Sequence, residues 1–126
     1  MITLRLKLLD EIFSIHRFSK SKEVPFEVFQ SSFFSISKTD EELSIICPAS
    51  LAFDSEQCNN GWMCIKVIGP LDLNLIGIMS KLSSVLTEAQ ISVFALSTYD
   101  TDYILIKSEK AKEAKEALEA AGYKFM

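Results

Sequence analysis

The sequence ISVFALSTYDTDYILI, at residues 91–106, decides the fold that we expect for the second half of the chain. Its two ends, residues 91–96 and 103–106, are runs of mostly apolar residues that are typical of strands. The turn between them is rich in hydroxyl and carboxylate side chains. A turn needs only one or two polar residues. The additional donors and acceptors therefore predict a site for a small zwitterion.

The residues before this hairpin predict another strand. Residues 62–68 alternate in character, and Met63, Ile65 and Val67 fall on one face. Gly69-Pro70 then breaks the pattern, because proline cannot donate a hydrogen bond to a neighbouring strand. We therefore expect the strand to end there.

A helix is expected after this break, over residues 74–90, with Asp72 or Asn74 as its N-cap. Its first turn would offer free backbone N–H groups, which favour an anion. The apolar positions recur at helical spacing and predict one buried face. These positions are Leu75, Ile78, Met79, Leu82, Val85, Leu86 and Ala89.

The C-terminal residues complete the pattern of elements. Residues 109–121 are rich in Ala, Lys and Glu and predict a helix that Gly122 stops, and residues 123–125 could add a short edge strand. From residue 62 the order is then β-α-β-β-α-β, which is the ferredoxin-like arrangement of the α+β class. Two helices would cover one face of a four-stranded antiparallel sheet. The first 60 residues, and a similar sheet from another chain, would cover the other face.

The first 60 residues show a shorter version of the same pattern. A short helix is expected over residues 24–30, with Pro25 in its first turn. No periodicity is visible over residues 49–61, so a second helix would be reduced to residues 50–58. The expected strands span residues 3–9, 11–18 (with a bend near Asp10-Glu11), 32–37 and 43–47, and Pro48 ends the last of them.

The segment Asn59-Asn60-Gly61 is the best candidate for a domain boundary, because Asn and Gly favour turns. We therefore predict two ferredoxin-like units in tandem, with antiparallel sheets and helices on one face. The first unit, residues 1–60, is degenerate. The second, residues 61–126, is regular.

Composition excludes several classes of function. The 126 residues carry a net charge of −4, which argues against a nucleic-acid surface, and no apolar run is long enough to cross a membrane. The three cysteines form no Cys-x-x-Cys pair, and the lone histidine, His16, lies in a strand-like run. We therefore expect no metal and no cofactor. An odd cysteine count without a secretion signal fits the cytoplasm.

Four C-terminal segments carry a resemblance to a known family: GPLD at residues 69–72, GI at 77–78, ISV at 91–93 and STYDTDYILI at 97–106. They resemble the ACT domain and, more narrowly, tandem-ACT proteins related to the CASTOR-type arginine sensors of animal cells. Residues 33–46 resemble the first ACT unit of that family. The resemblance covers nearly the whole chain, and the turn signature Ser-Thr-Tyr-x-Thr-Asp-Tyr is its most specific part.

ACT domains are small regulatory modules that bind amino acids at interfaces between units. The resemblance implies that backbone N–H groups near the helix start hold the ligand carboxylate, and that Asp102 pairs with an ammonium or guanidinium group. It also implies that Ser92 and Val93 face the ligand from a second copy of the chain. The implied ligand-binding residues are Leu71, Asp72, Leu75, Gly77, Ile78, Ser92, Val93, Thr98, Tyr99, Thr101 and Asp102.

Two departures from the arginine sensors concern the identity of the ligand. Those proteins carry an acidic residue where this chain has Leu75, and an aromatic residue where it has Thr101. The loss of one carboxylate weakens the case for arginine. The resemblance therefore implies an amino acid or a similar small molecule without specifying which.

The expected function is a regulatory or sensor module that binds an amino acid, acts as a homodimer and has no catalytic activity of its own. One alternative is a structural module that uses the same sheet only to dimerise. An enzyme is a weaker hypothesis, because a single histidine and two arginines offer neither a Ser-His-Asp triad nor a basic anion-binding loop. A module without a catalytic domain must act on a partner protein, which the sequence does not identify.

Overall fold

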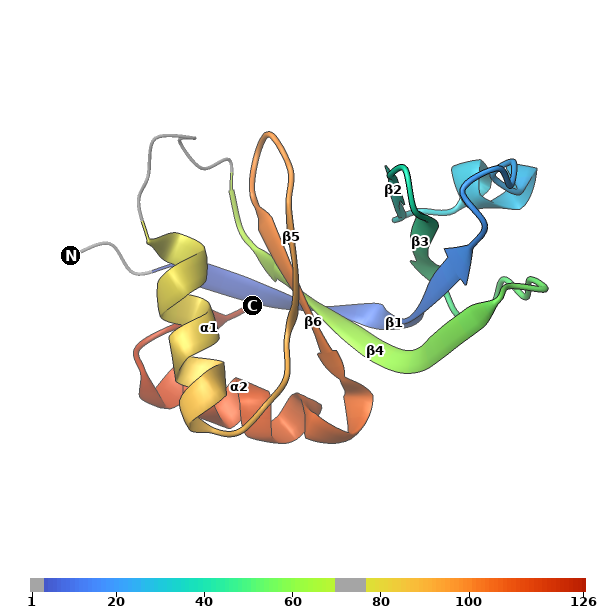
Figure 1. Cartoon of the computed structure of the whole chain (residues 1–126). Coiled ribbons are helices and arrows are strands. Elements are labelled where there is room, and N and C mark those ends of the chain that lie inside the picture. Colours follow the sequence, from blue (N-terminus) through green and yellow to red (C-terminus); the bar gives the residue numbers. More distant parts are fainter. Residues whose placement is uncertain (1–3, 70–76) are drawn as a thin grey trace. The chain divides into compact units, whose positions relative to one another are not determined.

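The computed structural model describes residues 4–69 and 77–126, which form two compact units (Figure 1). Unit 1 contains Met1–Asp10 and Met63–Met126, and unit 2 contains Glu11–Trp62. The strands β1 and β4 contribute residues to both units. The strands are β1 (Arg5–Phe18), β2 (Ser35–Lys38), β3 (Leu43–Pro48), β4 (Gln57–Val67), β5 (Phe94–Ser97), β6 (Asp102–Lys107) and β7 (Lys124–Phe125). The helices are α1 (Ile78–Glu88), α2 (Ala111–Ala120) and two 3-10 helices, η1 (Phe26–Gln30) and η2 (Ser108–Lys110).

Unit 1 has the predicted α+β, ferredoxin-like order β4-α1-β5-β6-α2-β7. Its strands lie in the order β1-β4-β6-β5, and β7 pairs in parallel with β1 through Arg5↔Lys124 and Leu6↔Phe125. Four strands were predicted for this unit, but it has a fifth, because the start of β1 lies between β7 and β4. The short β7 finds its partner there: Lys124 and Met126 N–H groups donate to Leu4 and Leu6 carbonyls, at 3.3 and 2.8 Å.

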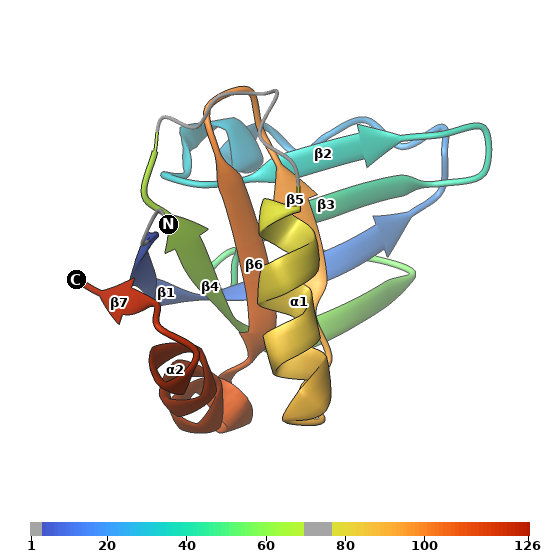
Figure 2. The same cartoon turned by 90° about the vertical axis from the view of Figure 1, so that its left-hand side faces the viewer.

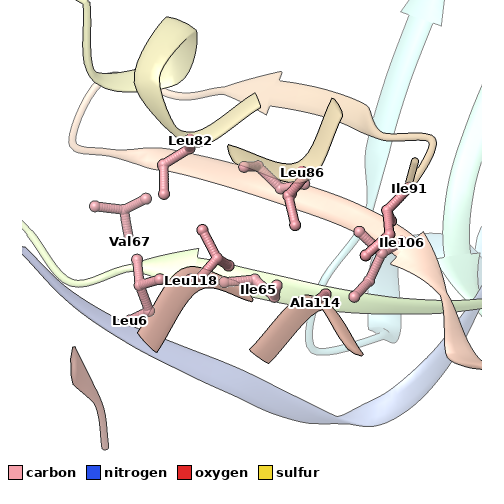
Figure 3. Close-up of a cluster of buried hydrophobic side chains, with 10 residues drawn as sticks. Leu6, Ile65, Val67, Leu82, Leu86, Ile91, Ile106, Ala114 and Leu118 are labelled. Carbon is pink, nitrogen blue, oxygen red and sulfur yellow. The ribbon is translucent and has the colours of Figure 1, made fainter. Parts of the chain in front are cut away.

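Both helices of unit 1 cover the same face of its strands (Figures 1 and 2). Leu82 and Leu86 lie one turn apart on α1, as Ala114 and Leu118 do on α2, so each helix presents a single apolar stripe. Figure 3 shows these stripes meeting the strand residues in one cluster. The cluster consists of Leu6, Ile65, Val67, Leu82, Leu86, Ile91, Ile104, Ile106, Ala114 and Leu118, all buried.

The two α-helices of unit 1 end in the same hydrogen-bonded motif. After α1, the N–H groups of Gln90 and Ile91 donate to the carbonyls of Thr87 and Leu86, both at 2.9 Å. After α2, the N–H groups of Gly122 and Tyr123 donate to Glu119 and Leu118, both at 3.0 Å. This is the Schellman pattern, which requires a left-handed residue after the helix. Glycine takes that position after α2 (φ 103°), as predicted, whereas α1 uses Gln90 (φ 62°).

Unit 2 is built from strands in the order β2-β3-β1-β4. The end of β1 pairs antiparallel with β3, from Phe13↔Pro48 to Phe18↔Leu43, and β2 pairs antiparallel with β3. The predicted helix at residues 24–30 is the five-residue 3-10 helix η1, with Pro25 at its N-cap and Val28 buried. Its buried cluster contains Phe18, Val28, Leu43, Ile45 and Cys47.

The structure corrects the interpretation of residues 49–61. Asn59-Asn60-Gly61 is no boundary turn, because all three residues lie inside β4, where Gly61 has a positive φ of 82°. Both amide side chains accept hydrogen bonds within unit 2: Asn59 Oδ1 accepts from Trp62 Nε1 at 3.1 Å, and Asn60 Oδ1 accepts from the Ser14 hydroxyl on β1. The reduced helix expected at residues 50–58 is also wrong, since this segment consists of turns and irregular backbone before β4 begins.

One boundary between the compact units, at Trp62/Met63, lies two residues after the predicted division at residue 60, but unit 1 also includes the first ten residues. Whether residues 1–60 and 61–126 are two ACT-like units in tandem stays a prediction. No helix within the described ranges is long and apolar enough to cross a membrane.

Candidate functional site

The polar turn singled out in the sequence closes the β5–β6 hairpin. The strands pair antiparallel as far as Ser97↔Asp102. Beyond that pair, the Thr98 N–H donates to the Thr101 carbonyl at 2.8 Å, and the Thr98 hydroxyl accepts from the Thr101 N–H at 3.3 Å. Two residues, Tyr99 and Asp100, remain at the tip. The turn is therefore tied together by its own hydroxyl and backbone groups.

Thr101 fixes this turn to the end of β4. Its side chain is buried, and its hydroxyl donates to the Val67 carbonyl at 2.5 Å. Thr101 was predicted as a ligand-binding residue, and the structure shows that the proton of its hydroxyl is used within the protein. The hydrogen bond brings the hairpin end beside the last residue of β4, immediately before Ile68 and Gly69.

Asp102 is half-buried at the first position of β6. One carboxylate oxygen, Oδ1, accepts a hydrogen bond from the Ser97 hydroxyl at 2.7 Å. No Lys, Arg or His among residues 4–69 and 77–126 forms an ion pair with this carboxylate. A carboxylate that is held in place but lacks a cationic partner can accept charge-assisted hydrogen bonds from an ammonium group.

The two tyrosines of the turn have different surroundings. Tyr99 is 80% exposed at the tip. Tyr103 is half-buried, and burial, followed by Cys64 and Asp100, raises the pKa of its hydroxyl. The Tyr103 phenol therefore stays protonated at neutral pH and can donate a hydrogen bond.

The prediction of site residues omitted Ser97. Ser97 pairs with Asp102 in the strand register, and its hydroxyl orients the Asp102 carboxylate.

The start of α1 provides the second part of the predicted site. The predicted N-cap, Asp72 or Asn74, is wrong, because α1 begins at Ile78 and Gly77 is its N-cap, with φ 81° and ψ 7° and no side-chain cap. A Cβ placed on Gly77 would meet nothing within 4 Å, so its backbone is open to close approach. Ile78 instead packs partly against the apolar core. The other predicted residues here, Leu71, Asp72, Asn74 and Leu75, lie outside the described residues.

Ser92 and Val93 are not brought to the turn within one chain. They precede β5, whose four residues, Phe94–Ser97, separate them from Thr98. At about 3.3 Å per residue, this separation is roughly 16 Å. Val93 packs partly against the core of unit 1, and Ser92 is exposed. A ligand at the turn could meet these residues only from a second copy, as the resemblance implied.

The single histidine lies inside unit 2, where it is 3% exposed. Its Nδ1 is 3.0 Å from the Ser55 hydroxyl, and its ring stacks on Phe18 and meets the edge of Phe53. Burial lowers the pKa of His16. Within the described part of the chain, no group of three or more His, Cys, Asp or Glu residues could hold a metal ion.

Three solved structures show how widely this fold occurs. A protein from Agobacterium tumefaciens superimposes with a TM-score of 0.91 at 31% identity, over 100% of this chain and 94% of that one. A domain described as the C-terminal regulatory domain of aspartate kinase from Porphyromonas gingivalis gives 0.59 at 14% identity, over 96% of each chain. E. coli aspartokinase III, in complex with aspartate and ADP, gives 0.60 at 13% identity, over 93% of this chain and 32% of the kinase.

Comparison of the sequence with known families gives matches in both parts of the chain. A search of curated proteins found no match. A family model described only as an N-terminal domain matches residues 11–51. The ACT domain model matches residues 57–120, which is more than half of the chain and includes the β5–β6 hairpin. The chain therefore belongs to the ACT domain family.

Proposed function

We propose that this chain is a regulatory module that binds an amino acid at the end of the β5–β6 hairpin and has no catalytic activity of its own. The observation that carries the proposal is the Asp102 carboxylate, which Ser97 orients and which lacks a cation among the described residues. A ligand ammonium group would supply that cation. The membership of the ACT family and the fold shared with a regulatory domain of aspartate kinase support the same conclusion.

The remaining predicted residues suggest how the ligand would lie. Its carboxylate would meet backbone N–H groups near Gly77 and Ile78 and in the loop that contains Leu71, Asp72 and Leu75. The open space beside Gly77 supports close approach to the backbone there. Thr98 and Tyr99 would border the ligand at the turn. A tandem arrangement of the CASTOR type remains part of this proposal.

We further propose that a second copy of the chain completes the site with its own Ser92 and Val93. The separation of these residues from the turn along β5 supports this arrangement, because one chain alone does not bring them together. The module would then be a homodimer that senses a free amino acid and transmits its binding to a separate partner protein.

The absence of catalysis is supported by the state of the reactive side chains. The sole histidine is 3% exposed and so cannot reach a substrate as a general base. Burial raises the pKa of the Cys47 thiol to about 11, with a further contribution from Cys58, and that of the Cys64 thiol to about 12. Neither thiol is a nucleophile at neutral pH. The three free cysteines fit a reducing compartment such as the cytoplasm.

The direct test is the thermal stability of the purified protein in the presence of each of the twenty amino acids. A ligand that binds only the folded state stabilises it by about 2.7 kcal/mol at one hundred times its Kd. We expect one amino acid, or a few of similar shape, to raise Tm. We expect Asp102→Ala to abolish this rise, because the variant lacks the partner for the ammonium group.

Asp100→Ala is the matched control, because it removes a neighbouring carboxylate from the exposed tip of the same turn. It should leave the ligand-induced rise in Tm unchanged. If no amino acid raises Tm, or if Asp102→Ala responds like the wild type, the proposed site is wrong.

The sheet edge favours a second candidate function, a dimerisation module without a ligand. In the described residues, β5 is the last strand of the sheet, and its Phe94 is 36% exposed. A free edge with an exposed aromatic residue can pair with another chain. Light scattering distinguishes the two functions: a dimer whose mass and stability ignore every amino acid favours this candidate, whereas a monomer at high concentration excludes it.

A further inference from the structure

Unit 2 contains an open pocket of about 290 Å³ in a part of the fold that the proposed amino-acid site does not use. Three parts of unit 2 line it: Glu11 on β1, the 3-10 helix η1 with the two serines that follow it, and the end of β3 with the residues after it. These parts are far apart in the sequence. Their meeting is a product of the β1–β3 pairing, which begins at Phe13↔Pro48.

The lining of this pocket is negatively charged. Glu11 and Glu27, both exposed, are among the lining residues, which include no Lys, Arg or His. The Glu11 carboxylate is held in place, because its Oε1 accepts a hydrogen bond from the Ser32 hydroxyl at 2.6 Å. No residue in the described part of the chain donates a hydrogen bond to Glu27. Two carboxylates in one concave site attract a cation and disfavour an anion.

The other lining residues favour an organic cation over a metal ion. Ca²⁺ and Mg²⁺ prefer six or more oxygen ligands, and no described group of three or more His, Cys, Asp or Glu residues surrounds a metal position. Pro48 is buried and Leu51 is half-buried, so the pocket also has an apolar wall. Such a wall can pack against methylene groups. The volume lies at the lower end of the range for ligand pockets.

We propose that this pocket binds a small aliphatic amine, whose ammonium group pairs with Glu11 and Glu27 and whose methylene groups pack against Pro48 and Leu51. Gln30, which also lines the pocket, offers an amide oxygen as a further acceptor. The site is separate from the amino-acid site proposed at the β5–β6 hairpin, and neither depends on the other. The chain would thus respond to two chemically different small molecules.

The test uses 1,4-diaminobutane as the probe and 1,4-butanediol as its uncharged analogue, titrated into the full chain and followed by NMR. We expect the diamine to shift the signals of pocket residues with a saturable curve, and the diol to shift none. The variant Glu11→Gln/Glu27→Gln keeps the size of both side chains but removes both charges. It should weaken binding at least about tenfold, because charge-assisted hydrogen bonds are the stronger ones.

The matched control is Glu23→Gln/Glu88→Gln, which makes the same change in net charge at two exposed positions outside the pocket. It should bind the diamine like the wild type. The proposal is wrong if the diol binds as tightly as the diamine, or if the control variant weakens binding as much as the pocket variant does. It is also wrong if the signals do not saturate by about 10 mM diamine, a concentration on the order of the Kd of the weakest specific complexes. Added salt should weaken binding of the diamine to the wild type, since open sites are screened.

Discussion

Unit 1 packs two amphipathic helices against its strands, whereas the one helix described in unit 2 is the five-residue 3-10 helix η1. The cluster described above for unit 1 contains only aliphatic residues, from strands and from both helices, whereas the cluster of unit 2 contains a single helical residue, Val28. Unit 2 also buries an imidazole, that of His16. Both units use strands with similar apolar patterns, so the strands alone do not explain the difference.

The difference arises from the segments that connect the strands. In α1 and α2, buried residues recur every four positions, so that one face of each helix covers the sheet. In η1 only Val28 is buried, while Phe26 and Phe29 are 69% and 53% exposed. A single buried residue cannot hold a longer helix against a sheet, because isolated short helices are marginal in water. The helical segments therefore explain why two helices contribute to the cluster of unit 1 and why only Val28 of η1 contributes to that of unit 2.

The largest expected effects come from truncating one core leucine in each unit. Leu118→Ala in unit 1 and Leu43→Ala in unit 2 each remove a side chain that is at most 1% exposed. Each should lower the free energy of unfolding by about 2–5 kcal/mol. Urea unfolding followed by far-UV circular dichroism reports the helices of unit 1, and the fluorescence of Trp62 reports unit 2.

These two probes also sharpen the comparison between the units. Because β1 and β4 contribute residues to both units, we expect the two signals to change at the same urea concentration in the wild type and in both variants. If Leu43→Ala shifted only the Trp62 signal, the units would unfold independently. The exposed substitution Lys112→Ala on α2 serves as a control and should change neither midpoint.

A smaller effect is expected at the turn that distinguishes unit 1. Thr101→Val keeps the shape of the side chain but removes its hydrogen bond to the Val67 carbonyl. Loss of a buried hydrogen bond should cost about 1–3 kcal/mol of unfolding free energy. Thr98→Val at the exposed side of the same turn should cost less, since water can replace its hydroxyl. Equal losses of stability in the two variants would show that Thr101 does not anchor the turn to β4.

A still smaller effect is expected where the two helices of unit 1 end. Gln90 and Gly122 occupy equivalent left-handed positions, with φ 62° and 103°. A residue with a side chain in this conformation costs roughly 1–2 kcal/mol of stability, which glycine avoids. Glycine also increases the conformational entropy of the unfolded chain, and this offsets part of the stabilisation. Gln90→Gly should therefore raise the unfolding free energy by about 0.5–1 kcal/mol, and Gly122→Ala should lower it by a similar amount. Opposite signs in the two urea midpoints are the diagnostic result.

The sequence predicted the elements of unit 1 well because their signals are local. The stripe from Ile78 to Ala89 packs as expected, and the hairpin closes at Ser97↔Asp102. What it missed depends on contacts between distant residues. The short strand at residues 123–125 was expected, but its parallel partner β1 was not, because a two-residue strand carries no local signal for the strand that it pairs with. The role of the Val67 carbonyl as the anchor of Thr101 leaves no trace in the sequence.

Unit 2 was harder to predict because its local signals point away from its structure. Asn59-Asn60-Gly61 favours a turn by composition. In the structure these residues belong to β4, where the amide oxygens of the two asparagines accept hydrogen bonds from the side chains of Trp62 and Ser14. The pocket that contains Glu11 and Glu27 could not be found from spacing, because η1 and the end of β3 are brought to Glu11 only by the fold. The site proposed on unit 1 stays a prediction, and the sequence could suggest it because its most specific part is a contiguous segment, residues 97–103.

The last prediction concerns the polar group in the core of unit 2. Burial lowers the pKa of His16 below its ordinary value of 6.5, so the folded protein favours the neutral imidazole. Above the unfolded-state pKa both states are neutral, and His16 contributes no pH dependence. As the pH falls below about 6.5, the unfolded state takes up a proton before the folded state does. The contribution of His16 to the free energy of unfolding is therefore complete above this pH and is lost as the pH falls through the folded-state pKa.

Urea midpoints measured between pH 7 and 5 test this sign, in a window above the ordinary titration of Asp and Glu. We expect the wild type to lose stability across the window, with the change visible in Trp62 fluorescence, because His16 and Trp62 both belong to unit 2. His16→Gln carries an amide that can bond to Ser55 at every pH, so it should show a flatter pH profile even if it is less stable at pH 7. The cluster described for unit 1 contains only aliphatic side chains, and the pKa of the buried Cys64 thiol, about 12, lies far above this window, so neither would restore the slope. If stability depended on pH with the same slope in His16→Gln as in the wild type, groups other than His16 would cause the pH dependence. The burial of His16 in unit 2 would then have no effect on how stability changes with pH.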